Sequence, residues 1–339
     1  MQYGYFSLMR LVTFDIQRLP VFCVMLVSLM TLTGQISTGQ SIPQYSLHMM
    51  DRYQFNPAFA GMESSLSISG NYRSQWLGIA GNPVQKYVNA HMPFYLWNGA
   101  LGIAVQHESI GVQKLLNATV SYNYVLETDL GLFSAGIAAG VTQQSLDGSL
   151  LRTPDGEYEG PTILHNDPLL PNTIVHGIAP LFHAGVYYAG DYFEAGISVM
   201  GYTPGNVRLD EVQIRDRAAF TVFAEYFIES IPDISLYPTV FIESDLVQTQ
   251  ASIAVRTEYK DFMTLGVGVR GYSSNTLDAV VLIGGLRLSE NMRLLYAYDL
   301  SLSALSKVTE GSHELMLRYN LNRVIGAGLP PPVIYSPRF

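Results

Sequence analysis

Ionisable side chains recur along this sequence at positions that alternate with apolar residues. Twelve of them share the polar side of that alternation: Arg73, Arg256, Arg270, Arg287, Arg293 and Arg318, with Glu194, Glu225, Glu243, Glu258, Asp299 and Glu314. Such a ladder of charges could select a charged solute inside a pore. Alternatively, the charges neutralise one another, because ionisable groups away from bulk water need partners. Equal numbers of arginines and carboxylates favour a mutually neutralised network.

Motifs that mark common enzyme classes are absent from the sequence. It contains no Gly-x-Ser-x-Gly turn, no His-Glu-x-x-His pair and no phosphate-binding loop. His165, Asp167 and His176 share one polar stretch and are residue types that bind metals, but a metal site also needs an oriented outer shell. We therefore expect solvated loop residues there, no metal, no cofactor and no enzymatic activity.

Composition points to a wall between lipid and a polar space. Hydrophobic residues make up 48% of the chain and charged residues only 14%, against roughly 25% charged residues in soluble domains. The 22 tyrosines could form belts at membrane interfaces. A soluble β-sandwich with a large core is the alternative. The formal charge of -9 argues against nucleic acid as a partner.

The first 39 residues have the pattern of a signal peptide and leader. Arg10 and Arg18 precede an apolar run from Leu19 to Leu32, and small and polar residues follow through Gly39. The apolar run is short for a membrane-spanning helix. Cys23, the only cysteine, lies inside this leader, so the exported chain has no disulfide. We expect residues 40–63 to form a periplasmic N-terminal segment.

Period-two alternation of apolar and polar residues dominates the rest of the chain, which indicates strands with one apolar and one polar face. It predicts about 14 strands at 64–73, 84–94, 98–108, 115–127, 130–144, 181–190, 192–202, 217–229, 233–243, 249–260, 262–272, 277–288, 291–302 and 312–321. Their length of about ten residues suits a tilted membrane strand. The fold class is therefore all-β, an antiparallel transmembrane β-barrel over residues 64–321 in the outer membrane, in contact with lipid.

The connections between these strands alternate between tight turns and longer loops. The longest loop, 145–180, contains five prolines and is expected to be irregular and to face outside. Residues 322–339 form a proline-rich tail, expected in the periplasm. Glycines on the polar face could make room for a plug or only bend the wall: Gly102, Gly136, Gly140, Gly196, Gly266 and Gly268.

Two segments at the ends of the predicted barrel resemble a known family. Residues 56–61 (Asn-Pro-Ala-Phe-Ala-Gly), 72–78 (Tyr-Arg-Ser-Gln-Trp-Leu-Gly) and 81–83 (Gly-Asn-Pro) are similar to the opening motif of the PorP/SprF family. Tyr298-Asp299, Leu302-Ser303 and residues 311–314 (Gly-Ser-His-Glu) resemble its closing motif. Phe59 and Ser74 depart from it, where the family often has Tyr and Asn.

The resemblance implies an outer-membrane component of type IX secretion and gliding systems that acts by protein–protein contact. Its implied partners are a secreted adhesin or the adhesin's C-terminal sorting domain, or the periplasmic ring proteins of the system. The motif residues then become candidates for partner binding: Asn56, Pro57, Gly61, Arg73, Trp76, His313 and Glu314. The alternative function is a solute channel, either a porin or a FadL-like transporter.

Overall fold

A computed structural model of the protein describes residues 44–94, 98–159, 163–167, 170–210, 212–214, 217–272 and 276–325. The predicted signal peptide, Cys23, the expected tight turn at 95–97 and residues 326–339 of the tail lie outside these ranges.

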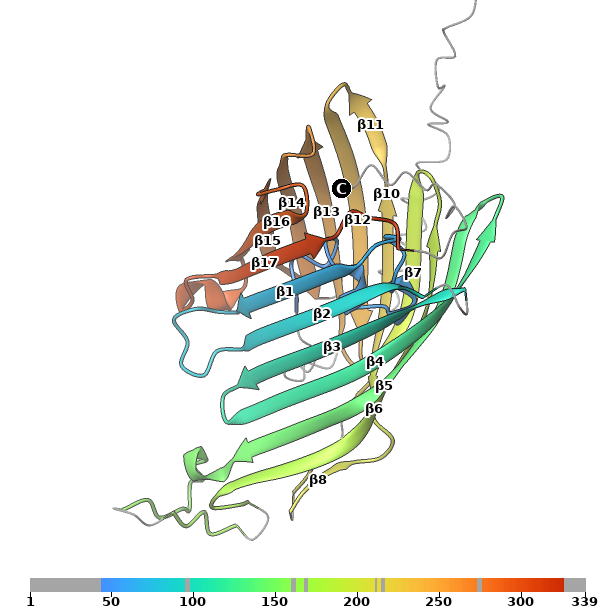
Figure 1. The fold of residues 1–339 in the computed structure, drawn as a ribbon. Helices are drawn as coiled ribbons and strands as arrows, with labels where there is room; N and C mark the ends of the chain where they lie inside the picture. Colours follow the sequence, from blue (N-terminus) through green and yellow to red (C-terminus); the bar gives the residue numbers. More distant parts are fainter. Residues whose placement is uncertain are drawn as a thin grey trace, which may run out of the picture. The chain divides into compact units, whose positions relative to one another are not determined.

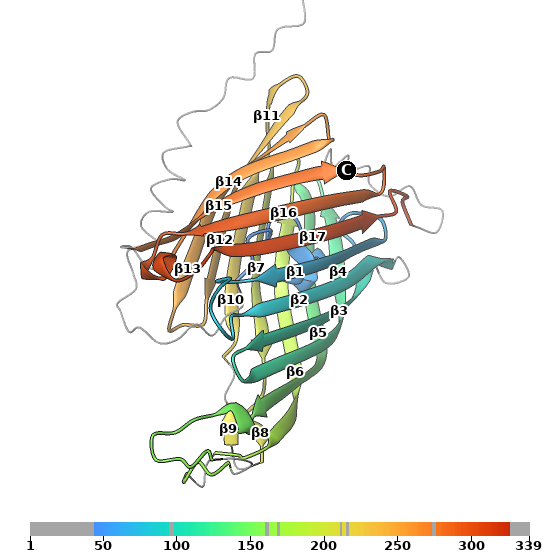
Figure 2. The same cartoon turned by 90° about the vertical axis from the view of Figure 1, so that its left-hand side faces the viewer.

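The structure is a closed antiparallel β-barrel (Figures 1 and 2). Its strands are β1 (Ser67–Ser74), β2 (Val84–Phe94), β3 (Gly99–Ile110), β4 (Gln113–Thr128), β5 (Gly131–Asp147), β6 (Ile174–Ala189), β7 (Phe193–Tyr202), β10 (Ala219–Tyr226), β11 (Ile228–Ile231), β12 (Ile234–Ser244), β13 (Thr249–Tyr259), β14 (Met263–Tyr272), β15 (Thr276–Arg287), β16 (Met292–Ser301) and β17 (Ser312–Asn320). Strands that follow one another in this order pair, except that β10 and β11 both pair with β12 and not with each other, and β1 pairs with β17.

Strands β10 and β11 occupy one position in the wall, because only Phe227 separates them and both pair with β12. The 15 strands of the sheet therefore make a 14-stranded barrel, which confirms the prediction. Next to this break, Pro238 of β12 falls between the residues that pair with β10 and those that pair with β11. Proline has no N–H to give to a ladder, so it is tolerated where the neighbouring strand is interrupted.

Two expectations about the connections are wrong. Strand β6 begins at Ile174, so the first seven residues of this strand belong to the wall and not to the loop predicted at 145–180. Pro180 pairs with Val141 of β5 but lies beyond the part of β6 that pairs with β7, so its missing N–H costs no ladder bond. The strands predicted at 98–108 and 115–127 leave residues 109–114 as a connection, but in the structure the connection is only Gly111 and Val112, where Gly111 adopts a positive φ of 54°.

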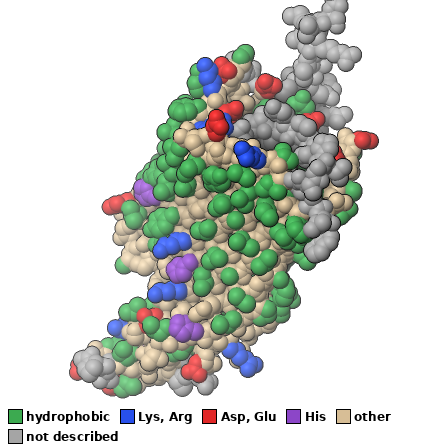
Figure 3. All heavy atoms as spheres, viewed as in Figure 1, with side chains coloured by type: hydrophobic (Ala, Val, Ile, Leu, Met, Phe, Trp, Pro, Cys, Tyr) green, Lys and Arg blue, Asp and Glu red, His purple; other side chains and the backbone are tan. Residues whose placement is uncertain are grey.

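The two faces of the wall differ as the alternation predicts. On β4, Val120 is 60% exposed while Ser121 is 2% exposed. Hydrophobic side chains cover the outer surface, coloured green in Figure 3. The strands of the barrel cross the outer membrane. Apolar side chains on the outer face contact the lipid, so polar groups are not exposed to it. Within the described ranges, no helix is long and apolar enough to span a membrane.

Residues 44–63 pass through the inside of the barrel, drawn in blue in Figure 1. They contain two short 3-10 helices, η1 (Arg52–Gln54) and η2 (Pro57–Phe59), and residues 44–60 are all buried. We call residues 44–60 the plug. The expectation of a separate periplasmic segment at 40–63 is therefore wrong for the described residues 44–63. Their apolar side chains, including Leu47, Met49 and Phe59, pack with inward residues of the wall.

Beyond the end of the neighbouring strands, β5 and β6 continue and carry a small structured extension. A hairpin of β8 (Val207–Leu209) and β9 (Val212–Ile214) packs against them, as Figure 2 shows. Leu146, Ala179, Val207 and Leu209 form a second buried apolar cluster there. The helix η4 (Gly148–Leu150) lies between β5 and the loop 151–173. We call β8, β9 and the segment 148–173 the loop platform.

Candidate functional site

The plug is joined to the wall first at Ser46. The Ser46 N–H donates to Glu314 at 2.5 Å, and its hydroxyl donates to Asp299 at 2.6 Å. Arg73 bridges the same two carboxylates, at 2.6 Å to Asp299 and 3.1 Å to Glu314. Arg270 contacts Asp299 at 3.0 Å. All five residues are buried, so two arginines and two carboxylates neutralise each other around one serine of the plug.

Arg52 makes the second junction between the plug and the wall. Its guanidinium pairs with Glu225 and lies 3.2 Å from Glu194. Arg256 also pairs with Glu225 and with Glu258, and Arg293 lies 3.1 Å from Glu258. Three carboxylates therefore face three guanidiniums, but the signs balance only because the plug supplies Arg52. Without it, buried wall carboxylates would lack a cation, which is costly in a low-dielectric interior.

A separate ion pair joins Glu63, just before β1, to Arg318 of β17 at 2.6 Å. Asn320 donates a second hydrogen bond to the Glu63 carboxylate at 3.1 Å. Burial alone would raise the pKa of Glu63, but the Arg318 guanidinium and the surrounding hydrogen bonds hold this pKa at about 2. The carboxylate is therefore charged at neutral pH, and it neutralises the charge of Arg318.

The structure brings together ten of the twelve residues predicted as a lumen charge network, all except Arg287 and Glu243. Arg256, Arg270, Arg293, Arg318, Glu258, Asp299 and Glu314 line the inside of the barrel and make the pairs given above. Arg287 does not join them. It ends β15 and donates to the carbonyls of Ser289 and Glu290 in the turn that follows. Alternation assigns Arg287 to the inner face, but its position at the strand end lets the side chain turn to the mouth.

Most of the opening motif seats the plug against the wall. The Asn56 side chain accepts from the Ala58 N–H and donates to the Val186 carbonyl at 3.0 Å. Pro57 begins η2, where its fixed φ suits the first helical position. Gly61 has a φ of 66° and donates to His91 at 3.1 Å.

These placements correct the expectation that Asn56, Pro57, Arg73 and Glu314 bind a partner directly, whereas Gly61 is half-buried. Asn56, Arg73 and Glu314 are at most 5% exposed, and Pro57 is buried with them. A residue enclosed between plug and wall cannot meet another protein while the plug is in place. Their contacts instead join the plug to the wall.

Trp76 and His313 lie at the seam where β1 pairs with β17. The Trp76 N–H donates to the Ser312 hydroxyl at 3.1 Å, and the loop after β1 exchanges backbone hydrogen bonds with Glu310 and Gly311. His313 lies on the outer face, 2.6 Å from the Tyr296 hydroxyl. The opening and closing motifs are thus brought together in space, and these two residues remain accessible at the surface.

Three of the six inward glycines make room for the plug. A Cβ at Gly136 would lie 2.5 Å from the Ala58 nitrogen, one at Gly102 would lie 2.3 Å from the Tyr53 hydroxyl, and one at Gly196 would lie 2.8 Å from the Asn56 amide nitrogen. The other three, Gly140, Gly266 and Gly268, approach only neighbouring strands. Room for a plug is therefore confirmed as the role of half of these glycines.

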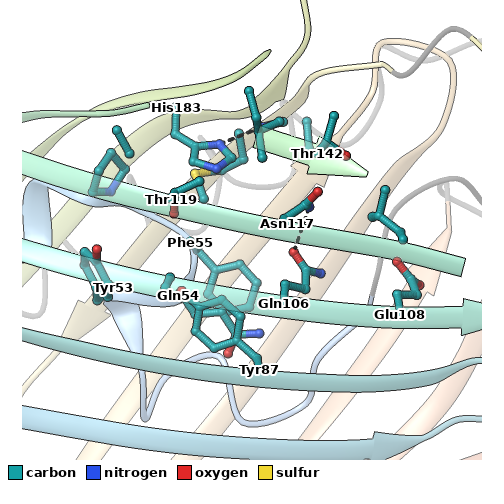
Figure 4. Close-up of a pocket in the computed structure, with 18 of the residues that line it drawn as sticks. Tyr53, Gln54, Phe55, Tyr87, Gln106, Glu108, Asn117, Thr119, Thr142 and His183 are labelled. Carbon is teal, nitrogen blue, oxygen red and sulfur yellow. Dashed lines mark hydrogen bonds between the residues drawn. The ribbon is translucent and has the colours of Figure 1, made fainter. Parts of the chain in front are cut away.

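A cavity of about 170 Å³ remains between the plug and the wall. Tyr53, Gln54 and Phe55 of the plug line one side (Figure 4). Inward side chains of β2 to β7 and β12 line the rest, among them Glu108 and Glu243. Gln106 and Asn117 are joined by a hydrogen bond of 3.3 Å, and His183 accepts from the Gly201 N–H at 2.7 Å.

His165 is buried in the loop platform, which corrects the expectation of a solvated residue. The Tyr158 hydroxyl lies 3.0 Å from Nδ1, while Nε2 faces the carbonyls of Gly148 and Pro171 at 2.9 and 3.0 Å. Since carbonyls only accept, Nε2 carries the proton and Nδ1 accepts from Tyr158. His165, Asp167 and His176 do not form a group of three potential metal ligands, since the described residues contain none.

Ser46, Arg52 and Glu63 were missed as functional residues by the sequence reasoning. They lie before the first strand, where no alternation marks an inward face. Only the structure shows that the wall supplies three carboxylates but two guanidiniums to this cluster. No sequence signal would therefore have identified Arg52 as the compensating cation.

Comparisons with known proteins agree on the class of protein. A family model described as type IX secretion system membrane protein PorP/SprF matches residues 37–319. No curated protein matches the chain. The fold is similar to that of the CymD monoaromatic hydrocarbon channel, with a TM-score of 0.52 and 13% identity over 86% of this chain and 96% of that chain.

Weaker similarities to other outer-membrane barrels accompany it. The toluene transporter TodX of Pseudomonas putida aligns with a TM-score of 0.46 and 12% identity, over 84% of this chain and 96% of TodX. A FadL homologue of Pseudomonas aeruginosa gives the same score and identity over 79% and 93%. At such identities, the likeness to CymD shows a shared barrel fold and nothing about solutes.

Proposed function

The chain belongs to the PorP/SprF family of type IX secretion system membrane proteins, and from that premise we propose that it is a docking barrel that acts by protein–protein contact and not by catalysis. In this proposal the loop platform and the neighbouring loops hold an exported surface adhesin, or the adhesin's C-terminal sorting domain, at the outer membrane. The periplasmic ring of the system is the second proposed partner, at the opposite end of the barrel.

The observation that carries the proposal is the occupied lumen. Residues 44–60 are buried throughout, and the plug is joined to the wall by hydrogen bonds from Ser46 to two carboxylates and by ion pairs from Arg52. A solute channel needs a continuous path, and binding inside it must be weak enough for release. A segment held by buried ion pairs obstructs such a path. The described part of the loop platform shares a buried apolar cluster with β5 and β6, which supports it as a surface for a partner.

A solute channel is the second candidate function. The cavity beside the plug favours it, since it could be one station on a path around the plug. The two functions differ in conductance. Purified barrel in a planar bilayer should give little steady current if it is a plugged docking barrel, whereas large ohmic, ion-selective steps would identify a channel.

Partner recovery tests docking directly. Co-purification of the barrel from native membranes, followed by mass spectrometry, should recover an exported protein with a C-terminal sorting domain or components of the periplasmic ring. A variant that lacks residues 155–167 of the loop platform should retain a folded barrel and lose the exported protein. If that variant recovers the same partners in the same amounts, the loop platform is not the docking surface.

A further inference from the structure

Two buried carboxylates beside the plug stand apart from the neutralised charges of the lumen. Glu108 and Glu243 are each 6% exposed, and both line the cavity. Within the described ranges, Glu243 has no hydrogen bond or ion pair, and Glu108 accepts one hydrogen bond from the Gln85 amide at 3.0 Å. Neither carboxylate has a cationic partner there. Burying an unpaired charge is costly, so these two groups are charged only when a cation joins them.

The nearby arginines are engaged elsewhere. Arg270 donates to Asp299 at 3.0 Å and also to Ser46 and Gln44. Arg217, which lines the same cavity, pairs with Asp245 at 3.5 Å and is 47% exposed. The cavity therefore has two carboxylates aimed into it and no uncommitted cation of its own among the described residues.

The rest of the lining suits a cation on an apolar stem. Tyr45, Tyr53, Phe55 and Tyr87 supply aromatic rings, which attract an ammonium or guanidinium group. Leu115, Ala138, Leu181 and Met200 supply aliphatic surface. An apolar cavity of about 150 Å³ takes a benzene-sized molecule, so this cavity of about 170 Å³ has room for one long side chain or a small amine.

We propose that this cavity is a binding site for a single organic cation, a primary ammonium or a guanidinium on a short alkyl chain, held by Glu243 and Glu108. Gly201 and Arg217 lie where the wall meets the loops after β7, so the ligand enters from the long-loop end. The cation is either the side chain of a lysine or arginine in a protein segment or a free small amine. The site does not depend on the docking function proposed above.

Calorimetric titration of the full barrel in detergent tests the site with matched probes. N-acetyl-lysine methylamide should bind at least tenfold more tightly than N-acetyl-norleucine methylamide, which has the same stem without the charge. Equal affinities, or no binding of the lysine probe, would overturn the proposal. This comparison uses the unaltered protein and needs no variant to fold.

Substitutions then locate the cation within the barrel. Glu243→Gln and Glu108→Gln should each weaken the lysine probe at least tenfold. Glu127→Gln, which alters an exposed carboxylate at the other end of β4, should leave its affinity unchanged. If folded, heat-modifiable Glu243→Gln barrel binds the lysine probe as the wild type does, the site is not at this cavity.

A final comparison separates the two sources of the cation. The peptide Gly-Gly-Lys-Gly-Gly and n-butylamine carry the same ammonium group. Tighter binding of the peptide assigns the site to a protein segment, and equal binding assigns it to a free amine. Either result supports the cation site, whereas failure of both probes to bind contradicts it.

Discussion

At the scale of single residues, Arg52 is the clearest link between the plug and the wall. It is the only plug cation in a cluster that otherwise has one more carboxylate than guanidinium. Its guanidinium also lies 5.2 Å from the centre of the Phe223 ring, a favourable cation–π distance. Ion pairs and a packed aromatic ring thus both hold the Arg52 side chain in place.

Arg52→Met should release the plug. Loss of one partner from a buried ion pair costs about 3–5 kcal/mol because the remaining charges stay buried without compensation. We expect limited proteolysis to cut within residues 44–60 in this variant while the barrel stays intact. The control is Arg152→Met, which removes an arginine of the loop platform that is exposed and lies over the Tyr158 ring. Equal resistance of the two variants would show that Arg52 does not hold the plug.

Glu63 predicts how stability changes in acid. Its pKa falls from the ordinary value of 4.5 to about 2 in the folded protein. A lowered folded-state pKa means that the stabilisation is complete above about pH 4.5 and is lost as the pH falls through about 2. The full effect is about 3 kcal/mol.

The corresponding measurement compares wild type with Glu63→Gln by urea unfolding in lipid. The difference in unfolding free energy should be largest near pH 7 and should shrink steadily below pH 4.5. A difference that is constant from pH 7 to pH 2.5 would contradict a role for the charged form of Glu63.

At the scale of secondary structure elements, the strands serve two environments at once. Strand β5 shows this well, because Ile137 is 65% exposed on the outer face while Gly136 touches the plug from the inner face. Adjacent residues of one strand therefore have different surroundings, lipid on the outer face and the plug on the inner face.

Gly136→Val should disturb the plug, because even a Cβ at this position would lie 2.5 Å from the Ala58 nitrogen. We expect folded barrel with a displaced plug, seen as increased conductance in a planar bilayer. Gly284→Val is the matched control, since nothing lies within 4 Å of a Cβ at Gly284 of β15. Unchanged conductance in Gly136→Val would mean that the plug adapts or does not block the lumen.

Val120→Arg should impair insertion of β4. A charge on the lipid face near the midplane costs about 2–4 kcal/mol, and Val120 is 60% exposed there. Asn117→Arg places the same side chain on the inner face, beside the cavity that contains Glu108 and Glu243. The heat-modifiable fraction on gels should fall in the first variant only. Similar folded fractions would show that Val120 does not face lipid.

At the scale of the whole molecule, the ends of the barrel differ. One end has the entry to β1, the exit from β17 and short turns such as Lys260–Phe262, and the other has the loop platform. Outer-membrane barrels place short turns in the periplasm and longer loops outside. We expect a tag inserted after Asp155 to be labelled on intact cells, and a tag at Asp261 to be labelled only after permeabilisation. The reverse pattern would invert the orientation.

The sequence by itself determined the wall of this protein. Alternation depends on local side-chain geometry, so the number of strands and most of their limits could be predicted from neighbouring residues. The prediction failed at the start of β6, where Pro180 suggested a loop. This part of β6 does not pair with β7, so one edge of the strand is free and tolerates proline. The family resemblance was also confirmed, because its motifs are contiguous stretches of sequence.

Only the tertiary structure decided what fills the inside of the barrel. The contact from Ser46 to Glu314 joins residues 268 positions apart, and no local pattern encodes such a pair. Alternation predicts the face of a side chain but not its height or its partner. For that reason Arg287 and Glu243 were wrongly placed in the network, and residues 44–60 were not identified as the plug for which the inward glycines could make room. Charge compensation is a property of the closed interior, where residues distant in sequence share one low-dielectric space.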